Sequence, residues 1–400
     1  YAHYLMKEET ITPFQRCHFE PCCFVHYTEM DDVRMIEVDA GESVPLRIVV
    51  MIYVDDGQTW DNCAAICDPF FDRMCERFSI TMGGGGQTYM LGMDIALGEG
   101  WLKIYSSTYI LNLCQRWLDY PIAEYDHVSS PYHPKLMDYF EAALAMRGNT
   151  PPELCTRYKS LVGGGLFPCP TTRPDCLFVA GIHARAMDFA TEDLFKTALY
   201  WLVYMGQTHA MGITYTREGI NAREYIHYSD SDWAIRRSTT GGTGQLAMGS
   251  VISQSRKQDC ITGSSTHAEI VAASANSNDV VWTRGFLNEI GYRVVMASPT
   301  RLMVDAKNVL TLVYNFESSK QTRHITRREL IVREREVEGH HVVTKVDTLD
   351  NVADLLTKAL DPTPFDRLRR MLLNVLAIGA IYPVPRARRI AAKRAAATRD

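Results

Sequence analysis

Apolar and β-branched runs alternate with polar turns along the chain, and their spacing predicts a mixed α/β protein. The run LRIVVMIYVDDG at residues 46–57 predicts a buried strand that enters a tight turn at two aspartates and a glycine. YMLGMDIAL and GWLKIYSS, at residues 89–97 and 100–107, predict a hairpin. The segment TYILNLCQRWLDY at residues 108–120 then predicts an amphipathic helix.

The second half of the chain alternates between predicted helices and strands. The proline-containing stretch from Ser129 to Pro152 is expected to be a connection, and helical segments are expected between Leu177 and Tyr204. Residues 223–255 hold three strand-like runs separated by glycine-rich turns, and a long helix is expected from Thr266 to Gly291. Short strand and helix patterns follow as far as Leu360. An antiparallel trio followed by alternating units predicts a mixed sheet flanked by helices, an α/β (α+β) fold.

Composition narrows the class of protein. The 400 residues are 46% hydrophobic, which is enough for a substantial core and for two or three domains. The formal net charge of -5 excludes a strongly basic nucleic-acid binder, so contact with phosphates must come from local patches of lysine and arginine. The 11 cysteines show no zinc spacing and are expected to be reduced thiols of an intracellular protein. Apolar runs at Leu46–Val54 and Met371–Val384 are too short to cross a bilayer, so no membrane partner is expected.

Four acidic residues stand where predicted elements begin or end. Asp230 and Asp305 end strands, Glu269 lies in the first turn of a helix, and Asp354 opens the last helix. Strand ends and helix starts are places where side chains can converge on one edge of a sheet. Carboxylate oxygens suit Mg²⁺, which keeps part of its water shell and binds substrate phosphate directly. Two such ions about 4 Å apart can activate a water molecule and stabilise the leaving oxygen of a phosphodiester.

Each of these acids also has a structural explanation. The run from Thr266 to Glu269 fits a capping box, in which the glutamate satisfies backbone donors of the first helical turn, and Asn351 to Asp354 has a similar form. Asp230 alternates with Asp232 at a strand end, where both can be solvated, and Asp305 can cap the helix that follows it. The prediction of a metal site therefore depends on the order and placement of the whole set.

Ten short motifs follow one another along the chain: MIYVDD, YMLGMDIA, YKSLVGGGL, TRPDCLF, YSDSDWA, RRSTTGG, SSTHAEIVA, LMVDAKN, TRHITRRELIVRE and NVADLLTKAL. From about residue 14 to residue 365 the chain resembles the C-terminal part of a copia-type retrotransposon Pol polyprotein. The resemblance implies the end of a reverse transcriptase followed by a ribonuclease H domain. It places Asp230, Glu269, Asp305 and Asp354 on the four acidic positions of that domain. It also implies two Mg²⁺ ions, or Mn²⁺ in their place, and cleavage of the RNA strand of an RNA–DNA hybrid.

The YVDD segment resembles the metal turn of the reverse transcriptase, with Asp55 as the direct ligand and Asp56 as the second acid. Without the resemblance, a surface Asp-Asp-Gly turn between strands is the default interpretation. Reverse transcriptases of this family carry another catalytic aspartate well before YVDD, and the chain begins at Tyr1 without a methionine, too late to contain it. We therefore expect a fragment or processed product that does not synthesise DNA on its own.

Departures from the family pattern bear on the nuclease. His267 stands where the family usually has glutamate, and Ala306 stands where it has asparagine. Between Trp233 and Arg236 the sequence is several residues short, which tightens the loop after the first strand and can move Asp230. Such drift also suits a decaying copy of the element.

Basic side chains are weaker candidates for substrate binding. Arg323, His324 and Arg327 can contact the phosphates of the hybrid, or they can belong to a solvated helix face with Arg–Glu pairs. The segment from Arg386 to Arg399 is rich in arginine and lysine and is expected to be a disordered basic end. Nucleic-acid binding and nuclear import are its alternatives.

These patterns divide the chain into four expected parts: the palm end and thumb of a reverse transcriptase (1–128), a connection (129–220), a ribonuclease H-like domain (221–362), and a C-terminal helix with a basic tail (363–400). We expect it in a cytoplasmic particle or the nucleus, bound to nucleic acid and to upstream parts of the same polyprotein. Two alternatives to a nuclease stay open. One is a catalytically inactive retroelement remnant, and the other is a nucleic-acid-binding arm of a larger Pol polyprotein.

Overall fold

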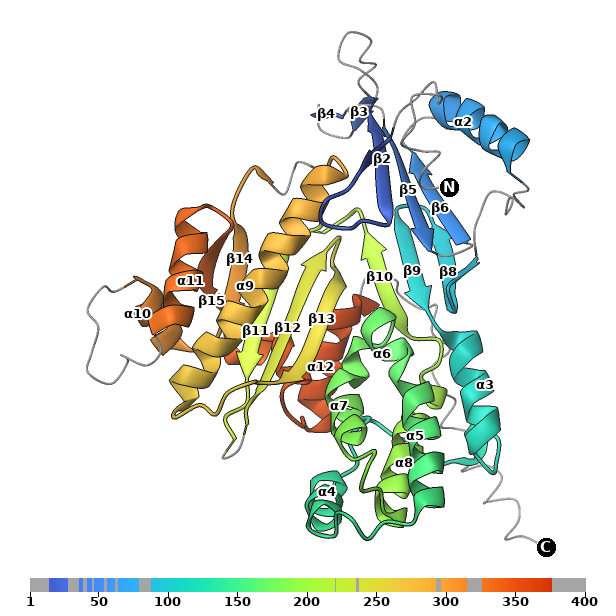
Figure 1. Cartoon of the computed structure of the whole chain (residues 1–400), viewed down its shortest axis with the longest axis vertical. Coiled ribbons are helices and arrows are strands. Elements are labelled where there is room, and N and C mark those ends of the chain that lie inside the picture. Colours follow the sequence, from blue (N-terminus) through green and yellow to red (C-terminus); the bar gives the residue numbers. More distant parts are fainter. Residues whose placement is uncertain are drawn as a thin grey trace, which may run out of the picture. The chain divides into compact units, whose positions relative to one another are not determined.

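The computed structural model describes residues 14–27, 36–38, 42–44, 47–53, 56–61, 64–78, 88–219, 221–234, 237–292, 296–314 and 326–375 (Figure 1). The fold is mixed α/β, as the sequence predicts. The chain divides into two compact units. Unit 1 comprises residues 1–87, 223–227 and 273–345, and unit 2 comprises residues 88–222, 228–272 and 346–400.

Unit 1 contains an antiparallel sheet of strand order β1-β2-β5-β6. The apolar run predicted as a strand forms β5, whose middle residues are buried. Helix α2 follows the sheet in sequence (Figure 1). The bounds are β1 (Gln15–Arg16), β2 (Cys23–Tyr27), β5 (Arg47–Tyr53), β6 (Asp56–Asp61) and α2 (Ala64–Arg77). A separate two-stranded ribbon joins β3 (Ile36–Val38) to β4 (Glu42–Val44).

The sheet of unit 1 is covered on both faces. One face packs on α2 through a cluster of buried side chains: Phe14, Phe24, Ile48, Val50, Phe70 and Met74. The other face presents Val25 and Val49 to Phe286 and Ile290, at the end of helix α9 (Ser265–Glu289). The carboxylate of Glu289 also accepts hydrogen bonds from the backbone amides of His18 and Phe19, each at 3.0 Å. Burial on both faces explains the near-continuous apolar run of β5.

Unit 2 begins with an antiparallel sheet of strand order β10-β9-β8-β7. The predicted hairpin is confirmed as β8 and β9, and the predicted amphipathic helix follows as α3. The bounds are β7 (Tyr89–Met90), β8 (Met93–Gly98), β9 (Trp101–Tyr105), α3 (Ser107–Trp117) and β10 (Gly212–Thr216).

The rest of unit 2 before β10 is a bundle of helices (Figure 1). Their bounds are η2 (Ile122–Glu124), α4 (Leu136–Ala145), α5 (Pro152–Leu166), α6 (Pro168–Thr171), η3 (Pro174–Cys176), α7 (Leu177–Arg185) and α8 (Glu192–Gln207). The stretch from Ser129 to Pro152, expected as a connection, therefore contains α4. The bundle shares its core with the C-terminal helix α12 (Pro362–Leu373), through residues such as Tyr158, Trp201 and Leu368.

A five-stranded sheet has the strand order β13-β12-β11-β14-β15. Strands β12 and β13 are antiparallel, whereas β14 and β15 are parallel, so the sheet is mixed as predicted. A parallel pair needs a long crossover, which helices α10 and α11 provide. The bounds are β11 (Ile226–Ser231), β12 (Thr239–Leu246), β13 (Gly249–Lys257), β14 (Thr300–Val304), α10 (Lys307–Tyr314), α11 (Thr326–Val337) and β15 (His341–Lys345).

Candidate functional site

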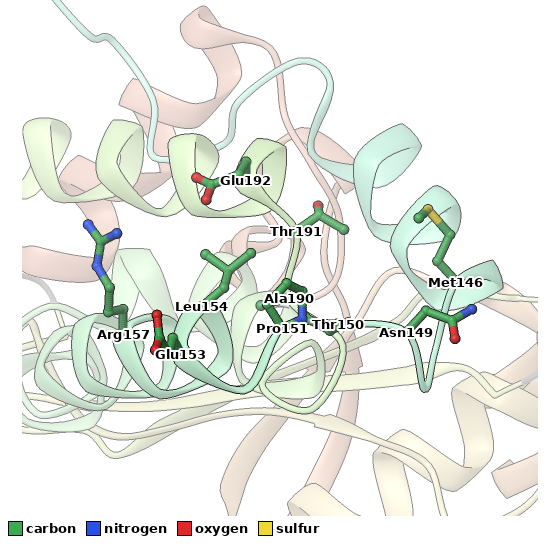
Figure 2. A pocket seen from close by; sticks show the side chains of 10 residues that line it. All are labelled: Met146, Asn149, Thr150, Pro151, Glu153, Leu154, Arg157, Ala190, Thr191 and Glu192. Carbon is green, nitrogen blue, oxygen red and sulfur yellow. The ribbon is translucent and has the colours of Figure 1, made fainter.

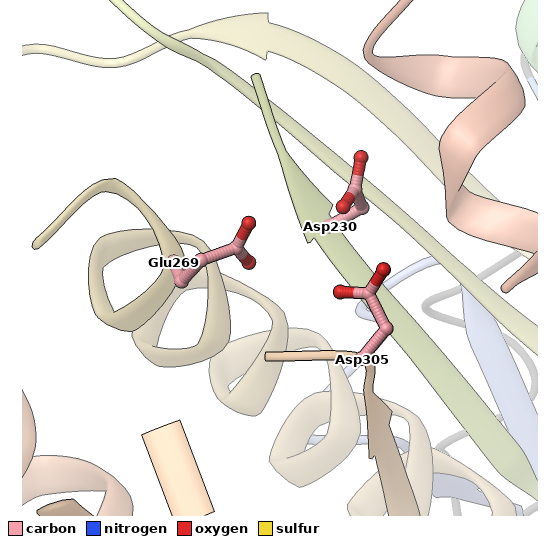
Figure 3. Close-up of side chains that lie close together, drawn as sticks. All are labelled: Asp230, Glu269 and Asp305. Atoms are coloured by element: carbon pink, nitrogen blue, oxygen red, sulfur yellow. The ribbon is translucent and has the colours of Figure 1, made fainter. Parts of the chain in front are cut away.

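Three of the four predicted acids converge. Asp230 comes from β11, Glu269 from the start of α9, and Asp305 from the residue directly after β14 (Figure 3). Each offers one carboxylate oxygen, and these three atoms all lie within 4.8 Å of one another. Asp230 is only 1% exposed, whereas Glu269 and Asp305 are half-buried. Despite the short loop that follows Trp233, Asp230 lies in this group.

Glu269 owes its position to the way helix α9 begins. The helix starts at Ser265, and the hydroxyl of Ser264 accepts a hydrogen bond from the backbone amide of His267 at 3.1 Å. That bond makes Ser264 the cap, and His267 takes the third helical position, where a capping box needs its glutamate. Thr266 therefore lies inside the helix, at its second position, and Ser264 lies at the cap. The carboxylate of Glu269 points toward Asp230 and Asp305 (Figure 3).

A buried polar cluster joins the first residues of β11 to helix α9 within unit 1. The Nε2 atom of His227 lies 3.1 Å from the side-chain oxygen of Asn276, and its Nδ1 atom lies 3.0 Å from the hydroxyl of Tyr225. That hydroxyl also lies 3.2 Å from the hydroxyl of Thr283. Burial lowers the pKa of His227 to about 4, so its imidazole is neutral at pH 7. The cluster connects a site-bearing strand with a site-bearing helix through neutral hydrogen bonds.

Asp305 is held through its backbone. The Nζ atom of Lys345 donates a hydrogen bond to the carbonyl oxygen of Asp305. Lys345 is the last residue of β15 and pairs with Val304 in the parallel register of β14. The pairing of β14 with β15 therefore also fixes the position of Asp305 at the end of β14.

Asp354 is placed by a short 3-10 helix, η6 (Val352–Leu356). Asn351 caps this helix, because its side-chain oxygen accepts from the amide of Ala353 at 3.3 Å. The side-chain nitrogen of Asn351 donates to the carbonyl of Ser229 at 3.2 Å, which fastens η6 beside β11. Asp354 is not among the three acids whose oxygens converge, and its side chain is largely buried.

A lysine and a threonine connect Asp354 to Asp230. The Nζ atom of Lys358 lies 3.1 Å from Oδ2 of Asp354 and 3.5 Å from Oδ2 of Asp230. The hydroxyl of Thr357 donates to the same Oδ2 atom of Asp230. Neither residue belongs to the set of acids predicted from the sequence. The signal for them in the sequence is their spacing of three and four positions after Asp354, which in a helix brings side chains together.

The two acids that could be confused with the site have other partners. Both carboxylate oxygens of Asp232 accept from Thr239, through its backbone amide and its hydroxyl, where β12 begins. Asp350 forms an exposed ion pair with Arg367.

The remaining predicted site residues are less fully described. Asp55 lies outside the described residues, and Asp56 is an exposed residue that opens β6 and pairs with Tyr53. Arg323 and His324 also lie outside the described residues. Arg327 belongs to α11, with its side chain outside the description, and the basic segment from Arg386 lies beyond the described residues. Their roles stay predictions.

A cavity of about 400 Å³ lies elsewhere in unit 2, lined by residues of α5, the start of α8 and the segment between α4 and α5 (Figure 2). Its charged lining residues are Glu153, Arg157 and Glu192, and Met146 and Leu154 add apolar surface. No predicted site residue lines it, so it is separate from the carboxylate group. Among the residues that the structure describes, no helix combines the length and the apolar character that a membrane crossing needs.

No protein-family model matches the chain. The Retrovirus-related Pol polyprotein from transposon RE1 of Arabidopsis thaliana is 27% identical over 340 residues, which cover 84% of this chain and 22% of that protein. The Pol polyprotein from transposon TNT 1-94 of Nicotiana tabacum is 25% identical over 81% of this chain and 24% of its own length. This chain thus spans less than a quarter of the length of these relatives.

Shorter matches also exist. The secreted RxLR effector protein 161 of Plasmopara viticola is 32% identical over 129 residues, or 31% of this chain and 89% of that protein. Among solved structures, RNase H1 of the halophilic archaeon Halobacterium salinarum matches 34% of this chain and 94% of its own, with 16% identity and a TM-score of 0.26. The long polyprotein alignments and the mixed sheet agree with the motifs in the sequence. Over most of its length the chain is similar to a segment of copia-type retrotransposon Pol polyproteins, and its fold is mixed α/β.

Proposed function

We propose that this chain hydrolyses the RNA strand of RNA–DNA hybrids with the help of divalent metal ions. The observation that carries the proposal is the convergence of oxygens from Asp230, Glu269 and Asp305 within 4.8 Å. The three acids come from three different elements, a strand, a helix start and a strand end. Three acidic side chains brought so close from separate elements need a compensating positive charge.

The donor set fits a hard divalent cation. All the converging ligand atoms are carboxylate oxygens, which suit Mg²⁺ and also Mn²⁺, and no cysteine or histidine belongs to the group. We assign Asp230, Glu269 and Asp305 to one ion, and Asp230 with Asp354 to a second. When bound, such ions lower the pKa of a water molecule and stabilise charge on the leaving oxygen of a phosphodiester.

The chain's own contribution is to hold its acids in place before substrate arrives. Asp230 is buried in a central strand and accepts a hydrogen bond from Thr357. Glu269 follows a capped helix start, and Asp305 follows a strand whose register is set by β15. Ligands on rigid elements need little reorganisation, which favours reaction geometry. Because the bare acids repel phosphate, we expect hybrid to enter the site only with the cation.

Substitution of one ligand tests the proposal. The wild-type chain is expected to cut the RNA strand of a labelled RNA–DNA hybrid with Mg²⁺, and EDTA is expected to stop the reaction. Asp305→Asn keeps the size of the side chain but removes a ligand charge. We expect it to lower the cleavage rate at least about 100-fold, or about 2.7 kcal/mol of activation free energy. The measurement is a gel assay of cleavage under single-turnover conditions.

Asp350→Asn is the matched control, because Asp350 is an acid close to Asp354 in sequence that pairs with Arg367 at the surface. This variant should cut hybrid at the wild-type rate. If the wild type does not cut above background, or if Asp305→Asn cuts equally fast, the chain is not a ribonuclease H. Hybrid binding without any cleavage would instead favour the nucleic-acid-binding arm of a larger polyprotein.

A further inference from the structure

Lys358 occupies an unusual position for a lysine in an acidic site. Its ammonium lies within 3.5 Å of carboxylate oxygens from both Asp230 and Asp354. The side chains of these two acids are 2% and 8% exposed, whereas that of Lys358 is 40% exposed. The lysine therefore reaches from the surface to two buried carboxylates.

Two buried carboxylates that share one cation depend on it. Ionised groups with little access to water are costly unless an opposite charge is close, and like charges near one another add to the cost. Thr357 contributes a hydrogen bond to Asp230 but no charge. The ammonium of Lys358 supplies the charge, from a position four residues after Asp354 and just beyond η6.

We propose that Lys358 is the resident counter-ion of the Asp230–Asp354 pair, and that it makes the two halves of the site unequal toward divalent cations. The inference rests on the proposed nuclease site. A cation held by Asp230, Glu269 and Asp305 uses the three carboxylates that converge. A cation that uses both Asp230 and Asp354 has to compete with the ammonium of Lys358. The first ion thus binds tightly and the second binds weakly, so the second is taken up only at higher metal concentration.

The first test needs neither metal nor substrate. In EDTA, Lys358→Met leaves the pair without its cation and is expected to lower the midpoint of thermal unfolding by about 3 °C or more. Lys159→Met is the matched control, because Lys159 also forms an ion pair with an aspartate, Asp188 at 2.8 Å, but both side chains are at least half exposed. It should shift the midpoint by less than about 1 °C. Circular dichroism follows unfolding for both variants.

The second test measures metal binding by calorimetry with Mg²⁺ and by electron paramagnetic resonance with Mn²⁺. The wild type is expected to show one tighter and one weaker site. Lys358→Met is expected to strengthen the weaker site at least tenfold and to change the tighter site less. Added Mg²⁺ should also raise the unfolding midpoint of Lys358→Met more than that of the wild type, because the ion takes over the role of the lysine.

A further variant keeps the inference testable if Lys358→Met does not fold. Lys358→Met combined with Asp354→Asn removes both charges and should recover most of the lost stability in EDTA. The inference is overturned if Lys358→Met and Lys159→Met unfold at the same midpoint, or if the wild type and Lys358→Met bind metal with the same number of sites and the same affinities. Neither measurement depends on cleavage. A chain that never cuts hybrid would contradict the proposed nuclease activity but not the role of Lys358 as counter-ion.

Discussion

Gly241→Ala is expected to lower hybrid cleavage about 100-fold and to destabilise the protein by about 1–3 kcal/mol. A Cβ atom on Gly241, in β12, would lie 2.5 Å from a methyl carbon of Thr357 and 3.0 Å from the backbone oxygen of Ala353. A backbone oxygen cannot avoid the clash by a change of rotamer, as a flexible side chain can, so η6 would have to move away from the sheet. This helix carries Asp354, and Thr357 and Lys358 lie just after it. A shift of about 1 Å would therefore misplace Asp354, one of the four proposed metal ligands.

Two measurements check this expectation, the single-turnover cleavage rate and the midpoint of urea unfolding. Gly163→Ala is the matched control, because Gly163 lies in α5 with no atom within 4 Å of the position of an added Cβ. Alanine is the better helix former, so this control should be neutral or stabilising by up to about 1 kcal/mol. Equal cleavage by Gly241→Ala and the wild type would show that η6 does not position the site.

The three glycines of helix α5 show why part of the fold escaped sequence analysis. Glycine is a poor helix former, yet α5 continues through Gly163–Gly165 to Leu166. A Cβ on Gly164 would lie 2.7 Å from Leu113, and one on Gly165 would lie 2.6 Å from Trp201. The glycines let α5 approach α3 and α8 closely. Tertiary packing overrides helix propensity here, and a single sequence does not contain that information.

Strands and helices with a strong local pattern were predictable. β5 is a run of β-branched and apolar residues, and the β8–β9 hairpin and α3 follow clear alternation and helical periodicity. For these elements the local pattern and the tertiary environment agree, so the pattern suffices.

The candidate site, too, was predictable where it depends on local pattern and not where it depends on tertiary contacts. The types and order of its acids were visible in the sequence, as were the strand ends and helix start that carry them. The link between η6 and β11 was not, because the contact of Lys358 with Asp230 joins residues far apart in the chain. A helical spacing of four predicts that Lys358 can reach Asp354, but it does not predict which strand the pair faces.

Arg173→Met is expected to destabilise the protein by about 3–5 kcal/mol at pH 7, because it removes one partner of a fully buried ion pair. Arg173 donates two hydrogen bonds to the carboxylate of Asp175, both at 2.9 Å, and neither side chain is exposed. Tyr204 donates to the same carboxylate at 2.7 Å, and Arg369 donates to the Tyr204 hydroxyl at 3.0 Å. The network joins η3, α8 and α12, so its loss should weaken the core of unit 2. Urea unfolding of wild type and variant measures the effect.

The loss of stability caused by Arg173→Met is expected to depend on pH, whereas a simple loss of packing would not. Burial by itself would raise the pKa of the Asp175 carboxyl, but Arg173 opposes this and leaves the pKa below its ordinary value. In the wild type the carboxylate therefore adds stability that is present above the ordinary aspartate pKa of about 3.9 and is lost as pH falls through the lower folded value. Without Arg173, burial is expected to raise the pKa of Asp175. The buried carboxylate then lowers the stability of the variant most at neutral pH, and less at lower pH, where the carboxyl becomes protonated. The stability difference between Arg173→Met and wild type should narrow between pH 7 and pH 5.

Two further variants separate the buried pair from ordinary surface charge. Arg173→Met combined with Asp175→Leu removes both charges and should cost less than Arg173→Met alone, since no unpaired carboxylate is left in the core. Lys196→Met breaks an exposed pair with Asp193 and should change stability by no more than about 0.5 kcal/mol. If Arg173→Met is as mild as Lys196→Met, or if its cost does not change between pH 7 and pH 5, the charge of Arg173 does not stabilise Asp175. In that case apolar contacts would hold α8 and α12 together, and the polar network would add no net stability.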